Sequence, residues 1–428
     1  MKKEIGVVGL WHLGCILCAS WSKLGNKVIG FDYDTSRVKK LNEGIIPIFE
    51  PNLLEIIQQG LNSQMIRFSG DIKSLASCDF IFLSYDTPVQ VDDLSDTTIL
   101  EKSVEDIGSI MKDASILIVS SQSPVGLCRL LRNRLKEKKS SLELVYSPEN
   151  IRLGEAIQSY LNPSRIILGT ADSVTEKKCN NLFSQISADI LSMNLESAEV
   201  VKHGINSFLA MSIVFANHLA DICEFTGALI DDVTLGMKSD PRIGDKAYLS
   251  PGIGFSGGTL GRDLKVLNQK NLEIKGNAKL FGIIHELNDE RKNSIIGRIE
   301  KILSKVNGNL IGILGVTYKP GTSTLRRSLP LEIVKILTEK SFQVKVYDPK
   351  ADFSELSYKP KFLIASNIEE ASNSVDILVL LTEWKEFRDY EWKDIPKKMT
   401  NPIFFDTKNY LDEKKMISLG FNYYSIGR

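Results

Sequence analysis

The stretch Ile5-Gly6-Val7-Val8-Gly9-Leu10-Trp11-His12-Leu13-Gly14 opens the chain with a short apolar strand, a glycine turn and an apolar helix that runs to Leu24. A second strand follows at residues 27–31 and ends at Asp32. Asp32 lies at about the 20-residue distance from Gly9 that a dinucleotide-binding βαβ unit requires. The sequence therefore predicts a Rossmann-like first domain. An acid at this place favours NAD over NADP, because it accepts hydrogen bonds from the adenosine ribose and disfavours a 2′-phosphate.

Trp11 departs from this fingerprint, because it stands where the second glycine lets the backbone approach the pyrophosphate. An indole at this position could block the phosphates or force the loop aside. The alternative interpretation is a βαβ unit that keeps the fold and has lost or altered its cofactor, and the residues leave both open.

Further buried strands alternate with helices after this unit, at residues 80–83, 116–120, 144–146 and 166–168. The first three strands run into polar, turn-rich loops at residues 84–88, 120–126 and 147–152. Ligands of open parallel sheets bind beyond the carboxyl ends of the strands. The three loops together predict one binding crevice at that edge.

The composition is that of a soluble globular protein, with 428 residues, 43% hydrophobic residues, and 53 basic against 53 acidic side chains. The zero net charge gives no case for a nucleic-acid or membrane partner. No apolar run is expected to reach transmembrane length. Six scattered cysteines, with Cys15 and Cys18 on a predicted buried helix, indicate reduced thiols, a cytoplasmic location and no metal site.

The middle of the chain is predicted to hold two long helices, at residues 197 to about 225 and roughly 278–306. Lys202 and Asn206 are four residues apart and therefore share one face of the first helix. Between the helices lies the glycine loop, Gly252-Ile253-Gly254-Phe255-Ser256-Gly257-Gly258-Thr259-Leu260-Gly261-Arg262-Asp263. Its glycines suit either turns with positive φ or a close approach of a ligand, and the loop leads into a helix N-terminus, which attracts anions.

The last third repeats the βαβ theme in a second, smaller domain, with strands at residues 310–316, 342–347, 376–381 and 403–405. The strand-end loops of this domain carry four cations, which suit a diphosphate: Lys319, Arg326, Arg327 and Lys408.

The assembled pattern closely resembles the UDP-glucose/GDP-mannose dehydrogenase family over essentially the whole chain, and its UDP-glucose branch in particular. The matching stretches are residues 41–47 with Glu50-Pro51, Ser147-Pro148-Glu149, Lys202 with residues 206–210, Asp240-Pro241-Arg242-Ile243-Gly244, the glycine loop, residues 318–322, residues 381–387 and residues 425–428.

The resemblance implies an α/β fold of two Rossmann-like, doubly wound domains joined by a long central helix. It implies an NAD-binding domain at residues 1–195, a helical dimerisation domain at 196–305 and a nucleotide-sugar (UDP) domain at 306–428. Family members oxidise a sugar C6 alcohol to the acid in two NAD-dependent steps, as in polysaccharide biosynthesis, and the second step passes through a thioester on a cysteine of the glycine loop. The expected partners are a nucleotide sugar and a second copy of the chain.

The resemblance also assigns candidate site residues. The catalytic positions, with roles in orienting water, stabilising oxyanions and acid–base chemistry, are Glu149, Lys202, Asn206, Thr259 and Asp263. The cofactor positions are Gly9, Trp11, His12, Leu13, Gly14, Asp32, Arg37, Thr87, Pro88 and Arg326. The substrate positions are Arg242, Phe255, Gly257, Gly258 and Lys319.

The family's cysteine is absent, because its position is Thr259. A cysteine thiol titrates near ~8.5, whereas a threonine hydroxyl needs a dedicated base before it can attack. Other departures accompany it, namely Trp11, Gln122, Leu153 and Asn217-His218.

Three interpretations follow from these departures. The favoured one is an enzyme limited to a single oxidation, or a redox-neutral epimerase that oxidises transiently. The second is a non-catalytic nucleotide-sugar-binding protein, which explains Trp11 and Thr259 together. The third is a two-step dehydrogenase with a relocated nucleophile, for which Cys15, Cys18 and Cys223 are poor candidates because their contexts are helical and apolar.

Overall fold

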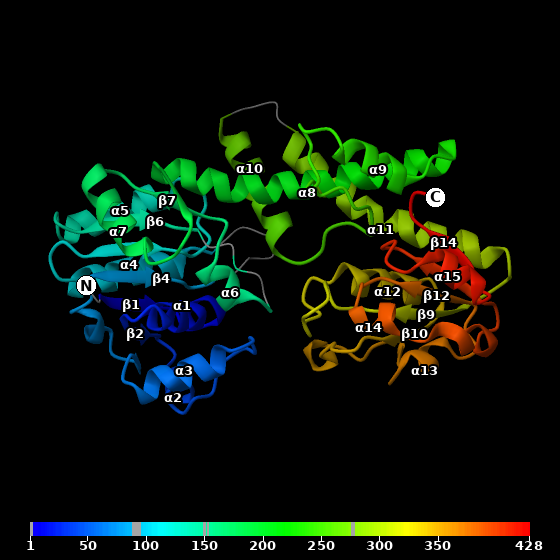
Figure 1. Ribbon diagram of the computed structural model, residues 1–428, viewed down its shortest axis with the longest axis horizontal. Coiled ribbons are helices and arrows are strands. Elements are labelled where there is room, and N and C mark those ends of the chain that lie inside the picture. The colour runs from blue at the N-terminus through cyan, green and yellow to red at the C-terminus, as the bar shows by residue number, and fades with distance from the viewer. Residues whose placement is uncertain (1–2, 88–95, 149–150, 152–153, 275–278) are drawn as a thin grey trace. The chain divides into compact units, whose positions relative to one another are not determined.

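The computed structural model describes residues 3–87, 96–148, 151, 154–274 and 279–428, and the chain divides into two compact units, Met1–Gly204 and Ile205–Arg428 (Figure 1). Each unit contains one twisted sheet whose two faces are covered by helices. The predicted α/β class with two Rossmann-like domains is confirmed.

The first unit contains an eight-stranded sheet with the order β3-β2-β1-β4-β5-β6-β7-β8. Its strands are β1 (Glu4–Val8), β2 (Lys27–Phe31), β3 (Ile66–Ser69), β4 (Phe80–Leu83), β5 (Ile116–Val119), β6 (Glu143–Tyr146), β7 (Arg165–Gly169) and β8 (Asp189–Met193). All neighbours are parallel except β6 and β7, which pair antiparallel through Tyr146 and Gly169. The expectation of a parallel sheet is therefore wrong at this one pair, because the chain turns back after β6 and β7 runs in the opposite direction.

The helices of the first unit cover both faces of this sheet. One face packs against α1 (His12–Lys23), α3 (Leu53–Asn62), α6 (Ala156–Leu161) and α7 (Ser173–Phe183). The other face packs against the short η1 (Ile72–Leu75), α4 (Thr98–Ile110) and α5 (Leu127–Lys138). The remaining helix, α2 (Thr35–Asn42), follows β2 and contacts β3. Because every strand end between β1 and β6 points the same way, their loops meet at one edge.

Helix α8 (Leu195–Thr226) begins in the first unit and ends in the second. It is long and apolar enough to cross a membrane by length and composition, so the expectation that no segment reaches that length is wrong. Its buried side chains include Glu199, His203 and Asn217, which hydrogen-bond to loops of the protein. These three side chains of α8 are therefore buried against the protein's own loops.

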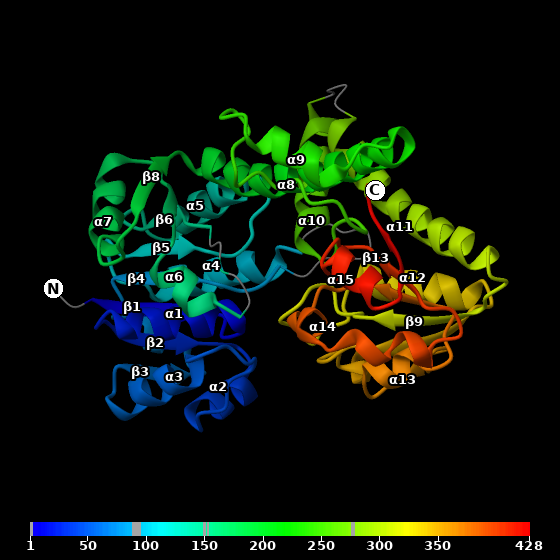
Figure 2. The ribbon, with the colours of Figure 1, turned by 45° about the vertical axis from the view of Figure 1, so that its right-hand side comes forward.

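The second unit contains a six-stranded, fully parallel sheet with the order β11-β10-β9-β12-β13-β14. Its strands are β9 (Leu310–Leu314), β10 (Gln343–Tyr347), β11 (Leu363–Ile364), β12 (Ile377–Leu380), β13 (Ile403–Asp406) and β14 (Asn422–Ser425). Figure 2 shows α12 (Leu329–Glu339) and α13 (Ile368–Ser372) on opposite faces of β9.

The remaining helices of the second unit surround this sheet and the end of α8. Helix α11 (Leu280–Ser304) packs on the α12 face, and α14 (Lys385–Asp389) and α15 (Glu413–Ser418) pack on the other. Helix α9 (Ile230–Lys238) follows α8, and α10 (Thr259–Glu273) packs against α11. Short 3₁₀ turns lie at η2 (Phe353–Glu355), η3 (Trp392–Asp394) and η4 (Pro396–Lys398).

Candidate functional site

The turn between β1 and α1 requires its two glycines for reasons of packing. Gly9 has φ +94°, and a Cβ there would lie 2.9 Å from the backbone nitrogen of Tyr85. A Cβ on Gly14 would lie only 1.8 Å from the carbonyl oxygen of Gly9. The first turn of α1 therefore sits directly against the strand end, as in a nucleotide-binding turn.

Trp11 occupies the N-cap of α1 with φ −85°, which any L-residue can adopt. No side chain caps α1 and no acid lies in its first turn, so its N–H groups suit a pyrophosphate. The indole is 41% exposed, and the guanidinium carbon of Arg37 lies 5.5 Å from its centre. Next to it, Leu13 is buried, and His12 Nε2 lies 3.0 Å from Glu50 Oε1.

We expect Trp11→Gly to change the dissociation constant of NAD by less than about tenfold. The backbone at Trp11 already has an ordinary conformation, so removal of the indole should leave the turn in place. The lost cation–π contact with Arg37 is a contact within the protein, so its loss does not directly weaken NAD binding. Calorimetry on both proteins measures this. An affinity gain above a hundredfold would show that the indole obstructs the cofactor.

Asp32 lies at the end of β2 and is 2% exposed. Its carboxylate accepts from the backbone nitrogens of Leu10 (2.7 Å) and Asp34 (3.0 Å), from Arg37 Nη1 (2.8 Å) and from the Tyr85 hydroxyl (3.3 Å). Burial, followed by the charge of Asp32, raises the pKa of Tyr85 and keeps it a donor. An adenosine ribose can hydrogen-bond to this carboxylate when Arg37 or Tyr85 releases its own hydrogen bond.

The loops after β4 and β5 lie side by side, as predicted. Thr87 Oγ1 donates to the carbonyl of Gln122 at 3.3 Å. The buried carboxylate of Glu199 on α8 accepts from Gly126 N (2.6 Å), Cys128 N (2.8 Å) and Ser123 Oγ (3.1 Å). Helix α8 thus fixes the second loop.

Two predicted positions lie outside the described residues: Pro88, a cofactor position, and Glu149, a catalytic position. Leu153, one of the departures from the family pattern, lies outside them as well. Of the third predicted loop, at residues 147–152, the structure therefore describes Ser147, Pro148 and Ile151.

The predicted catalytic pair Asn206 and Asp263 is brought together in the second unit. Asn206 Nδ2 donates to Asp263 Oδ2, and Asp263 is fully buried. Lys202 precedes Asn206 by one turn of α8 and therefore shares its face. A buried carboxylate held by an amide can handle a proton.

The glycine loop is fixed by one side chain and one backbone carbonyl of its own unit. Asn288 of α11 accepts from Phe255 N (2.7 Å) and donates to Phe255 O (3.1 Å), and Gly257 N donates to Arg327 O (2.9 Å). Gly254 (φ +108°) and Gly257 (φ +81°) have backbone conformations that favour glycine.

Of the two reasons expected for these glycines, positive φ therefore holds at Gly254 and Gly257. A Cβ there would also meet Asn288 Oδ1 at 2.6 Å and the Tyr318 ring at 3.0 Å. Close ligand approach is not what these two positions require.

The predicted substrate positions occupy different surroundings. Phe255 is buried in the apolar cluster between α8, α10 and α11. Gly258 caps α10 and lies beside the Arg327 side chain. Arg242 is exposed and pairs with Asp240, and the Lys319 ammonium lies 5.6 Å from the centre of the Tyr318 ring.

The cations expected to bind a diphosphate lie in loops at the carboxyl ends of β9 and β13. Lys319, Arg326 and Arg327 share the loop between β9 and α12. Lys408 follows β13 and pairs with Glu383 at 3.3 Å. Among the described residues, no cluster of His, Cys, Asp or Glu could hold a metal ion.

Thr259 is the first residue of α10 and is exposed, so a side chain at this position is open to reagents. No side chain caps α10 and no acid lies in its first turn. The end of this helix therefore favours negative charge on a group held at residue 259.

Sequence reasoning missed several buried polar residues that hold these loops, namely Glu50, Glu199, His203, Asn288 and Arg291. Glu50 accepts from Gly154 N at 2.7 Å, and His203 Nε2 lies 2.8 Å from Ser123 O. For the four residues that lie on helices, the available signal was a polar residue on the apolar face of the helix, whereas Glu50 lies in the loop before α3.

Three domain families match the chain in order. They are the NAD binding domain (residues 3–187), the central domain (196–290) and the UDP binding domain (312–413) of the UDP-glucose/GDP-mannose dehydrogenase family.

Curated relatives match over nearly the full length. The UDP-glucose 6-dehydrogenase of Rickettsia typhi is 32% identical over 99% of both chains. UDP-glucose 6-dehydrogenase TuaD of Bacillus subtilis is 30% identical over 100% of this chain and 93% of its own. In fold, a UDP-glucose dehydrogenase from Pyrobaculum islandicum superposes with a TM-score of 0.88 at 22% identity, covering 99% of this chain and 97% of its own.

Proposed function

Because this chain belongs to the UDP-glucose/GDP-mannose dehydrogenase family, we propose that it oxidises an alcohol of a UDP-sugar with NAD and stops before the acid. The observation that supports a stop before the acid is Thr259, which places an exposed hydroxyl at the start of α10 in the glycine loop. A thioester needs a thiol, and threonine has none.

The chain's own cysteines support this proposal, since all six are buried. Burial raises the pKa of the Cys15 thiol to about 12, and burial also raises the pKa of Cys18 well above its ordinary value. A buried thiol that stays protonated is a poor nucleophile. A nucleophile relocated to these cysteines is therefore disfavoured.

NAD, when bound, would accept the hydride that leaves the alcohol carbon. The protein must bind both molecules and take the hydroxyl proton. We assign the proton to the pair formed by Asp263 and Asn206, because Asp263 is buried and is hydrogen-bonded by Asn206 of α8. We assign the UDP diphosphate to the cations of the β9–α12 loop and Lys408.

Two alternatives stay in the proposal. A redox-neutral epimerase would use the same proton-handling group and return the hydride to the sugar. A non-catalytic UDP-sugar-binding protein is favoured by one observation, the full set of donors on Asp32, which leaves the ribose no unoccupied acceptor.

Calorimetry with NAD, with and without UDP-glucose, followed by analysis of the product and of NADH, separates these cases. Saturable NAD binding, net formation of NADH and an aldehyde product support the proposal, whereas an isomeric UDP-sugar without net NADH would support the epimerase. No NAD binding, with the UDP-sugar still bound, would support the non-catalytic alternative, and a uronic acid would contradict the single oxidation.

We also propose that the chain self-associates through α8. Phe208, Phe215 and Ile222 recur every seven residues and so lie on one face, with Phe225 beside them. Their side chains are between 49% and 91% exposed. Such an apolar stripe suits a second copy of the chain.

The cytoplasmic location also stays a prediction.

We expect Phe215→Asp to convert the assembly to monomers, because a carboxylate in the centre of an apolar interface is costly to bury. Light scattering on the purified protein measures the mass. Phe49→Asp is the matched control, since Phe49 is 82% exposed and lies in the first unit. Equal masses for wild type and Phe215→Asp would contradict the proposed interface.

A further inference from the structure

Two buried polar residues of α11, Asn288 and Arg291, lie about one turn apart and both reach the glycine loop. Arg291 Nε donates to Gly252 O at 2.9 Å, and Asn288 bonds both backbone groups of Phe255. From α8, Asn217 Oδ1 accepts from Gly252 N at 2.7 Å. Every one of these bonds ends on main chain, so side chains fix the backbone of the loop between Gly252 and Phe255.

The guanidinium of Arg291 is itself fixed by an ion pair. Arg291 Nη1 lies 2.6 Å from Asp221 Oδ1 of α8, and the arginine side chain is only 4% exposed. Burial lowers the pKa of Arg291, and the neighbouring carboxylate opposes that effect. Asp221 therefore offsets part of the cost of burying the charged guanidinium in this surrounding.

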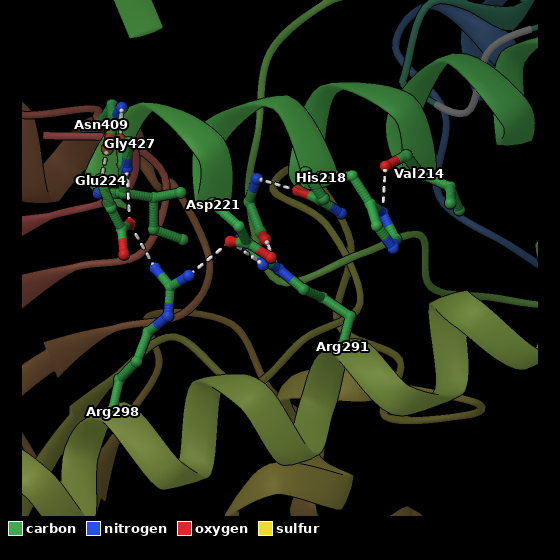
Figure 3. A network of polar contacts seen from close by, with 11 residues as sticks. Val214, His218, Asp221, Glu224, Arg291, Arg298, Asn409 and Gly427 are labelled. Carbon is green, nitrogen blue, oxygen red and sulfur yellow. Dashed lines mark hydrogen bonds and ion pairs between the residues drawn. The ribbon is translucent and has the colours of Figure 1, made fainter. Parts of the chain in front are cut away.

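A second arginine of α11 shares this partner without touching the glycine loop. Figure 3 shows Arg291 and Arg298 reaching from α11 to Asp221, with Arg298 also on Glu224. Glu224 accepts from Gly427 N at 2.7 Å. One end of the network thus holds the glycine loop and the other end holds the C-terminal segment.

We propose that Arg291 is a positioning residue for the reaction, because it holds the Gly252 carbonyl and thereby sets where the glycine loop delivers Thr259 and Asp263. This inference rests on the proposed oxidation. The loop contains glycines with positive φ, whose backbone freedom must be restricted by contacts from outside. Loss of one such contact displaces residues that act on the substrate, and a displacement of about 1 Å can cost on the order of a hundredfold in rate.

Asp221 supports the same positioning of the glycine loop, because it pairs with Arg291. Asp221→Asn leaves the buried Arg291 charge with a weaker partner, whereas Asp221→Asn combined with Arg291→Gln replaces the ion pair by two amides that can still hydrogen-bond. We expect the double variant to recover part of the activity that either single change removes. If only the charge of Arg291 were needed, the double variant would recover no activity.

Hydrogen–deuterium exchange on the full chain tests the inference without relying on activity. In Arg291→Gln, the amides of Gly252, Phe255 and Gly257 should exchange at least about tenfold faster than in the wild type. In the control Arg298→Gln, which loses the same Asp221 partner, these amides should be unchanged and the Gly427 amide should exchange faster. Equal exchange of the glycine loop in both variants would overturn the inference.

Kinetics supply the second readout. With UDP-glucose and NAD, Arg291→Gln should lower kcat by roughly 10- to 100-fold and change KM for the sugar less than about threefold. Arg298→Gln should keep kcat within about threefold. If the wild type oxidises no UDP-sugar, the proposed function fails, and the exchange measurement still tests whether Arg291 holds the glycine loop. Faster loop exchange with an unchanged kcat would contradict it.

Discussion

Replacing Gly14 by alanine is expected to abolish measurable NAD binding and to lower the free energy of unfolding by ~3 kcal/mol, the upper end of the usual overpacking cost. The added Cβ would lie 1.8 Å from the Gly9 carbonyl oxygen, which is backbone and cannot rotate away. Helix α1 must then move off the end of β1, and its N-terminal N–H groups leave the place where a pyrophosphate would lie. Calorimetry with NAD and chemical denaturation measure the two effects.

Gly297→Ala is the matched control for this change. Gly297 lies in α11, and a Cβ there meets nothing within 4 Å, so the same substitution should stabilise slightly or leave the protein unchanged. NAD binding by Gly14→Ala with an affinity within tenfold of the wild type would show that the cofactor does not use this turn. NAD would then be held by contacts other than those of the β1–α1 turn.

The fold was predictable where hydrophobic runs are buried on both sides. Strands β1, β2, β4, β5 and β9 were all expected from such runs, which parallel sheets favour. The edge strands β8 and β14 were missed, because most of their side chains are at least partly exposed and their sequences carry no continuous apolar signal. The reversal at β7 was also missed, since strand direction depends on how the chain returns.

The sequence predicts which residues belong to the candidate site better than it predicts which groups those residues contact. The spacing of Asp32 from Gly9 was recognised, yet the four donors on its carboxylate come from residues whose approach no sequence pattern specifies. Asn288 and Arg291 gave no motif at all, because their partners are backbone groups of a distant loop. Main-chain partners of this kind are invisible until the tertiary structure is known.

Replacing Thr259 by cysteine is expected to give the protein an acid-forming second oxidation, at least about a hundredfold above the wild-type background. The new thiol would be the first residue of the 15-residue helix α10, whose N-terminus has no side-chain cap. Helix N-termini and nearby arginines lower thiol pKa values below ~8.5, and Arg327 lies beside Gly258. A thiolate there can attack an aldehyde and form the thiohemiacetal whose oxidation leads to a thioester.

The cysteine can be checked independently of the product. All six native thiols are buried, so alkylation by iodoacetamide should report residue 259 alone, with a midpoint pH below that of a free thiol. Thr259→Ser is the control, because it keeps a hydroxyl and adds no thiolate, and it should form no acid. If residue 259 alkylates readily and mass spectrometry still finds only the aldehyde, Thr259 alone does not block the second step. The block would then lie in another departure from the family pattern, such as Gln122.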